Sequence, residues 1–134
     1  MQNKHPCGER LLTEIDFARL NKLPEGQFPP ELKDTLDSVD LVTSQTVPAD
    51  CITMYSQVVI EDLASGRRQK LTLCYPKDAE PHQGFISVLS PVGASLLGQR
   101  LGATVSWQSP NQDRFTARIV ELLFQPEATG DYTT

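Results

Sequence analysis

Few side chains in this sequence could ligate a metal ion or act as a nucleophile, and they stand far apart. His5 and Cys7 lie near the N-terminus, and His82 lies in a proline-rich stretch without a neighbouring ligand. A structural zinc site needs four Cys or His ligands at characteristic short spacings, and no Cys-x-x-Cys pair occurs. We therefore expect surface residues at these positions, with no metal ion and no cofactor.

The glycines and carboxylates give no stronger signal for catalysis. Gly93, Gly98 and Gly102 lack the Lys-Ser or Lys-Thr ending of a phosphate-binding loop, so we expect them in helix caps and tight turns. Glu25 is a lone carboxylate within a Pro-Glu-Gly turn. Because no nucleophile is matched with a base, the sequence predicts no catalytic residues and a protein that is not an enzyme.

The single tryptophan, Trp107, could line a pocket or belong to the core. Its large apolar area favours burial, so we expect a core residue. Phe85, Phe115, Phe124 and Tyr75 are spread over the strand-like segments, as core positions are. The aromatic residues therefore predict packing rather than a binding site.

The composition is that of a globular protein, with 39% hydrophobic and 22% charged residues. The net charge of −5 argues against sequence-independent binding of DNA or RNA, because such binding to phosphates depends on Lys and Arg. We also expect no direct sequence-specific nucleic-acid binding. Arg67, Arg68 and Lys70 form the densest basic run, which we expect to be a solvated face. Since no stretch has the roughly 18 apolar residues of a membrane span and no signal segment is recognisable, we expect a cytoplasmic protein without membrane contact.

For residues 1–46, the sequence predicts an N-terminal tail, two short helices and a linker. Thr13 has the character of an N-cap with an acidic residue three positions later, and a helix with one apolar stripe should run from there to Pro24. After a turn rich in Pro and Gly, a second helix should begin at Pro30. We expect the two helices to pair as a short antiparallel hairpin, with residues 41–50 as an irregular linker.

For residues 47–134, the sequence predicts a separate domain of strands around one short helix. Ser90 is the expected N-cap of that helix and Pro91 its first residue, while Gly98 should close it in the left-handed conformation. We expect strands at residues 56–62, 68–75, 86–89, 104–107 and 115–124. Short strands with one helix across one face indicate an α+β domain with a mostly antiparallel sheet.

Three stretches of this domain are distinctive, namely the segment from Ile86 to Trp107, the strand that ends in Tyr75-Pro76, and the tail from Phe124 to Tyr132. They resemble the carboxy-terminal domain that Gre-type transcript-cleavage factors share with the Rnk family. With the N-terminal pattern, the resemblance covers nearly the whole chain and favours the Rnk family, the regulators of nucleoside diphosphate kinase. It implies an FKBP-like fold for residues 47–134.

The resemblance also implies a function. Gre factors are thought to thread a long helical hairpin into the secondary channel of RNA polymerase, where acidic residues at its tip help to hold a catalytic magnesium ion. Such a site needs several oxygen ligands at the metal, whereas the expected hairpin here is short and its tip offers Glu25 alone. The resemblance therefore implies a regulator that binds RNA polymerase near the channel and competes with Gre factors without stimulating cleavage. The family name further implies a link to nucleoside diphosphate kinase.

The loop implicated in docking of Gre factors to the polymerase contains a Ser-Pro pair. The matching residues are Ser90 and Pro91, followed by Val92 and Gly93. Gre proteins carry Asp or Asn before this pair, whereas this sequence has Leu89, so the contact could differ. The same residues could instead serve only to cap the short helix.

Two other functions stay open at this point. An active cleavage factor would shorten RNA in a backtracked elongation complex. An FKBP-type prolyl isomerase would use Trp107 as the floor of an aromatic pocket, and its turnover of a Xaa-Pro peptide would be lost with that side chain.

Overall fold

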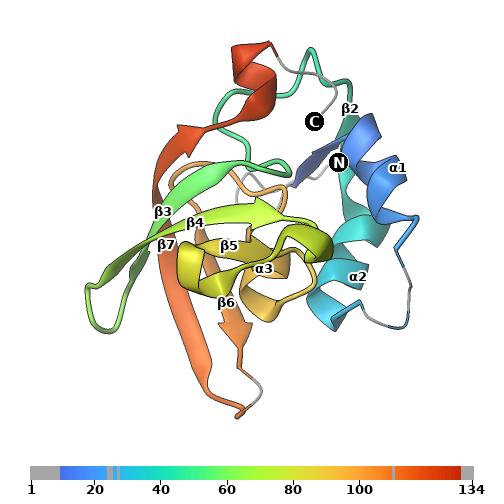
Figure 1. Cartoon of the computed structure of the whole chain (residues 1–134). Coiled ribbons are helices and arrows are strands. Elements are labelled where there is room, and N and C mark those ends of the chain that lie inside the picture. The colour runs from blue at the N-terminus through green and yellow to red at the C-terminus, as the bar shows by residue number, and fades with distance from the viewer. Residues whose placement is uncertain (1–9, 24–25, 27, 110, 131–134) are drawn as a thin grey trace, which may run out of the picture.

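A five-stranded sheet forms the centre of the structure (Figure 1). The computed structural model describes residues 10–23, 26, 28–109 and 111–130. The strands of the sheet are β3 (Gln57–Asp62), β4 (Arg68–Cys74), β5 (Phe85–Ser87), β6 (Thr104–Gln108) and β7 (Arg114–Phe124). All five agree with the expected strands to within a few residues, and the expected α+β class with a mostly antiparallel sheet is confirmed.

The spatial order of the strands is β5-β4-β3-β7-β6, and only the β4–β5 pair is parallel. The register between β3 and β7 shifts twice, between Gln57 and Val58 and between Val59 and Ile60. Because each such irregularity increases the local bend and twist of a strand pair, the sheet curls, as the long arc of β7 shows in Figure 1.

One short helix, α3 (Pro91–Leu96), packs beside β5 and β6. Its residues Ala94 and Leu96 are buried together with Val58, Leu73 and Ile119 of the sheet. The expected left-handed closure of this helix is confirmed, since Gly98 has a φ of 82°. The helix and one face of the sheet therefore share a common apolar core.

The expectation that the aromatic residues are core residues is wrong for three phenylalanines. Phe85, Phe115 and Phe124 are between 37% and 44% exposed, whereas Tyr75 is buried. Trp107 is half-buried and packs at the edge of the core. Strand positions alternate between two faces, but burial on a face also depends on whether another element covers it.

The N-terminal segment forms an arm of two helices, α1 (Glu14–Leu20) and α2 (Pro30–Ser38), flanked by the parallel strands β1 (Leu11–Thr13) and β2 (Asp40–Val42). The side chain of Thr13 accepts from the backbone N–H of Asp16 at 3.0 Å, which confirms the expected cap. Helix α1 ends at Leu20 instead of Pro24. The next backbone hydrogen bonds, from Lys22 to Arg19 and from Leu23 to Leu20, span three residues instead of four and form a turn.

The expected linker is partly wrong, since its first residues belong to β2. The antiparallel pairing of the two helices stays a prediction. Glu25, the expected tip residue, lies outside the described residues.

The arm contributes to the same core as the sheet. Leu12, Leu20 and Leu32 are fully buried and belong to one cluster with Met54 and Leu97. Burying one leucine side chain is worth about 1.5–3 kcal/mol. Residues 1–46 and 47–134, expected as separate units, are therefore joined through apolar contact, and independent folding of residues 47–134 stays a prediction.

Arg10 links the arm to α3 by hydrogen bonds. Its Nη1 donates to the hydroxyl of Thr35 in α2 and to the carbonyl oxygens of Ala94 and Leu97, at 3.3 and 3.4 Å. With the amide of Gln99 turned so that its oxygen faces Arg10, that oxygen accepts from Nε and Nη2 at 3.1 Å each. Burial lowers the pKa of Arg10, and the guanidinium satisfies carbonyls at the negative end of α3.

Asp16 is a buried carboxylate of the arm. Its Oδ2 accepts from the backbone N–H of Met54 at 3.2 Å, while its Oδ1 has no partner among the described residues. Desolvation raises the pKa of Asp16 to about 7, the hydrogen bond from Met54 lowers it, and the negative charge of Glu127 raises it. Glu127 itself accepts from the hydroxyl of Thr53 at 2.7 Å. Two buried carboxyl groups therefore lie close enough for one to affect the titration of the other.

Replacing Arg10 with Lys should destabilise the protein by about 2–4 kcal/mol, because an ammonium cannot reproduce the planar set of donors that joins α2, α3 and Gln99. Urea unfolding measures this loss. The exposed Arg118 on β7 provides the matched control, since Arg118→Lys should change the free energy of unfolding by less than about 0.5 kcal/mol. Equal effects of the two variants would contradict the linking role of Arg10.

Asp16 should make stability depend on pH. Its pKa in the folded protein, about 7, lies above its ordinary value of 3.8, so the folded state holds the proton more tightly than the unfolded chain. The free energy of unfolding should therefore fall as the pH rises from about 4 to about 7, by on the order of 4 kcal/mol, and stay level above that.

The variant Asp16→Asn, which cannot ionise, is the test of this dependence. The difference in unfolding free energy between parent and variant should change steadily between these pH values, with the variant gaining relative to the parent. Parallel pH profiles from urea unfolding would show that Asp16 does not titrate in this range.

Candidate functional site

The turn between β5 and α3 holds the residues expected to dock on a partner. The hydroxyl of Ser90 accepts from the backbone N–H of Gly93 at 3.1 Å and donates to the carbonyl oxygen of Ser87 at 2.7 Å. Ser90 has the extended conformation of an N-cap, and Pro91 occupies the first helical position. The expected cap is confirmed, and it also fixes the start of the helix to the end of β5.

Gly93 is required by close packing of backbone on backbone. A Cβ atom at this position would overlap the carbonyl oxygen of Ser87 and lie 2.9 Å from its carbonyl carbon. Gly93 is buried. The first turn of α3 can therefore rest on the end of β5 only because residue 93 has no side chain.

The four expected docking residues lie in one turn but differ in exposure. Ser90, Pro91 and Val92 are partly exposed, whereas Gly93 is buried. Leu89, which precedes them, packs against the core, as Val92 does in part. The surface that this turn presents therefore comes from residues 90–92, and Gly93 shapes their backbone.

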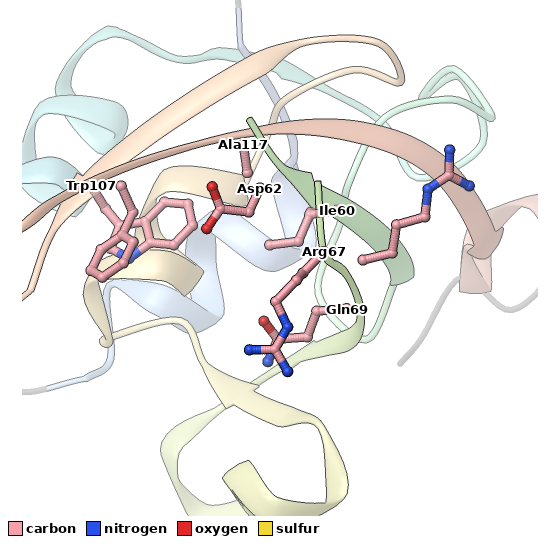
Figure 2. A pocket seen from close by; sticks show the side chains of 8 residues that line it. Ile60, Asp62, Arg67, Gln69, Trp107 and Ala117 are labelled. Atoms are coloured by element: carbon pink, nitrogen blue, oxygen red, sulfur yellow. The ribbon is translucent and has the colours of Figure 1, made fainter. Parts of the chain in front are cut away.

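A pocket lies elsewhere on the sheet, and the sequence did not indicate it (Figure 2). Its cavity measures about 470 Å³, and its lining includes the buried side chains of Ile60 and Ala117. Trp107 and Phe115 pair across β6 and β7, with ring centroids 5.8 Å apart and ring planes at 22°. Phe115 was expected in the core, but its exposed part faces this cavity.

Polar side chains complete the pocket. Asp62 at the end of β3, Arg67 in the following turn and Gln69 in β4 line it. Figure 2 shows Trp107 and Asp62 to one side of the pocket and Arg67 and Gln69 to the other. One oxygen of Asp62 accepts from the backbone N–H of Ala64 at 2.8 Å. The basic run, expected to be only a solvated face, thus contributes to a cavity. The sequence offered one signal for this pocket, namely a single tryptophan in one hairpin and a basic turn in another.

The described residues contain no group of three or more His, Cys, Asp and Glu side chains that could hold a metal ion. Cys51 and Cys74 are buried free thiols, and burial raises the pKa of both. His5 and Cys7 lie outside the described residues. Within the described part of the chain, no helix has the length and apolar character needed to cross a membrane.

Comparison with known proteins assigns the family. The family model described as "Transcription elongation factor, GreA/GreB, C-term" matches residues 47–123. The chain belongs to the GreA/GreB family. It is 37% identical over 128 residues to the regulator of nucleoside diphosphate kinase of Escherichia coli K12, a match that covers 91% of this chain and 94% of that protein. The expected resemblance to the Rnk family is thereby confirmed.

Two further relatives place this GreA/GreB family member among transcription factors. It is 32% identical over 101 residues to the elongation factor GreA of Solidesulfovibrio magneticus, covering 75% of this chain and 61% of that protein. The solved structure of a GreA/GreB elongation factor from Nitrosomonas europaea matches with a TM-score of 0.71 and 32% identity, over 87% of this chain and all of that one. Homology thus supports a regulator of the transcription-factor type.

The packing at the start of α3 can be tested with glycine substitutions. Gly93→Ala should destabilise this GreA/GreB family member by about 1–3 kcal/mol, because the methyl group has no room beside the carbonyl of Ser87. Gly26 is the control, since a Cβ there meets nothing within 4 Å, and Gly26→Ala should stay within about 0.5 kcal/mol of the parent. Urea unfolding gives both values, and an unchanged Gly93→Ala would refute the close contact.

Proposed function

We propose that this GreA/GreB family member is a cytoplasmic, non-catalytic regulator that binds RNA polymerase near its secondary channel and competes there with Gre factors. It does not stimulate transcript cleavage. The length of the arm carries this proposal. Helix α1 has seven residues and α2 has nine, which at 1.5 Å per residue correspond to about 10 and 14 Å.

The attachment of the arm supports the same proposal. Strand β1 pairs with β2 on one side, Arg10 bonds to α3 on the other, and Leu12 and Leu20 are buried in the common core. An arm held in this way cannot swing outward without exposing apolar surface. It can occupy the mouth of a channel, but it does not carry a metal ion to an active centre deep inside.

The charges of the arm agree with a competitor instead of a cleavage factor. Asp16, in α1, is buried, and its carboxyl group accepts a hydrogen bond from the backbone N–H of Met54. No group of three potential metal ligands occurs among the described residues. Glu25, the carboxylate at the proposed hairpin tip, lies outside the described part of the chain. A magnesium ion needs several oxygen ligands in a defined geometry.

In this proposal, residues 47–134 form the FKBP-like docking domain and residues 90–92 contact the polymerase. That turn is partly exposed, and two hydrogen bonds of Ser90 fix its conformation. A preformed turn loses little conformational freedom on binding. The name of the relative in Escherichia coli refers to nucleoside diphosphate kinase, and we extend a functional link with that enzyme to this chain.

The docking turn can be tested with Pro91→Glu. A glutamate at the first helical position favours the helix and leaves Ser90 in place, so the fold should be retained while the surface of the turn changes. Binding to purified RNA polymerase, measured by fluorescence anisotropy with labelled protein, should weaken at least tenfold. Thr104→Glu, on the exposed side of edge strand β6, is the matched control and should bind as the parent does.

Function is then measured on a backtracked elongation complex. The parent protein alone should leave the RNA length unchanged, and it should slow cleavage by an added GreA factor in proportion to its concentration. Pro91→Glu should lose this inhibition. Shortened RNA with the parent alone would overturn the proposal in favour of an active cleavage factor, and unchanged binding by Pro91→Glu would place the contact elsewhere.

A further inference from the structure

The pocket at Trp107 is not explained by docking through residues 90–92. It is lined by residues of the β3–β4 and β6–β7 hairpins. The docking turn lies between β5 and α3, and none of its residues 90–92 is part of that lining. The volume of the pocket, about 470 Å³, falls within the usual range of small-molecule sites. The pocket is partly open to solvent, so it can hold one side of a small organic molecule against the sheet.

The apolar part of the pocket offers a surface for a flat ring. Trp107 and Phe115 are nearly parallel, at 22°, and neither is fully covered by other residues. Ile60 and Ala117, both buried, complete the apolar lining. Aromatic side chains exposed in this way stack on nucleobases, a contact worth about 1–3 kcal/mol per base.

The polar part of the pocket presents complementary groups. Asp62 can accept hydrogen bonds, and Gln69 can both donate and accept. The guanidinium of Arg67 forms no ion pair among the described residues, so its donors are available to an anion. Arginine binds phosphate through two parallel hydrogen bonds. One cavity therefore combines a stacking surface, hydrogen-bonding groups for a base or sugar, and a cation for a phosphate.

We propose that this pocket binds a free nucleoside phosphate, with its base on Trp107 and Phe115, its base edge or ribose near Asp62 and Gln69, and its phosphate on Arg67 (Figure 2). A free nucleotide fits better than a nucleic-acid strand. The chain carries a net charge of −5, and affinity for a strand grows with the number of phosphates that Lys and Arg neutralise. The pocket needs only one such contact.

Trp107 is the only tryptophan of the chain, so its fluorescence reports on the pocket directly. Titration of the full-length protein with GDP should quench this fluorescence in a saturable way, and calorimetry should give the same affinity. Arg67→Ala should weaken GDP binding about tenfold but leave the weaker binding of guanosine unchanged, because guanosine carries no phosphate. Phe115→Leu should weaken both ligands.

Arg118→Ala is the matched control, since Arg118 is exposed on β7 and its neighbours Ala117 and Ile119 point to the opposite face. It should bind GDP as the parent does, and thermal melting confirms that each variant folds. The proposal is overturned if GDP gives neither quenching nor heat at millimolar concentration, or if Arg67→Ala and Phe115→Leu bind like the parent. It is also overturned if pyrophosphate alone binds as tightly as GDP.

Two further measurements separate other occupants of the pocket. A short single-stranded RNA that binds more tightly than GDP at the same salt concentration would make a nucleic acid the ligand and refute the proposal. Turnover of a Xaa-Pro peptide that is lost in Trp107→Leu would likewise assign the pocket to prolyl isomerisation. Absence of both activities, together with the GDP results above, supports the nucleotide site.

Discussion

The structure depends on one constraint, which is that the N-terminal helices can bury their apolar side chains only against the sheet. Helices of seven and nine residues fall below the length at which isolated helices are stable in water. Leu20 and Leu32 are nevertheless fully buried, because the core of the sheet extends beneath the arm. The arm is therefore held in place by the same apolar contacts that stabilise the sheet. It cannot extend away from the sheet, because its short helices would not be stable without these contacts.

Helix α3 transmits this constraint to the docking turn. At its start, Ser90 and Gly93 hold the helix on the end of β5. At its end, Arg10 bonds to the carbonyl oxygens of Ala94 and Leu97. The start of this six-residue helix is thus fixed by its own cap and by close packing, and its end by a side chain from the arm. Such support matters because a short helix has few internal hydrogen bonds of its own. The turn at residues 90–92 and the arm consequently have a fixed relation.

The sequence predicted the local structure well and the long-range structure less well. The strands, the cap at Ser90 and the closure at Gly98 follow from residue type and spacing within a few positions. The β1–β2 pair could not be predicted, because three-residue strands about 30 positions apart carry no periodic signal. The exposure of Phe115 was missed because one face of β7 is covered at Ile119 and open at residue 115. The pocket depends on that difference.

The two proposed binding surfaces are joined by one shared apolar core, which limits how they can influence each other. A ligand shifts a conformational equilibrium only as far as its affinity differs between the two states, and coupling between sites therefore needs an element with two arrangements. The strands β3 and β7 and the helix α3 contribute to one core, in which Val58 and Ile119 are fully buried. Among the described residues, this core shows no element with two alternative arrangements. A nucleotide at Trp107 therefore has no route through this core by which to change the shape of the docking turn.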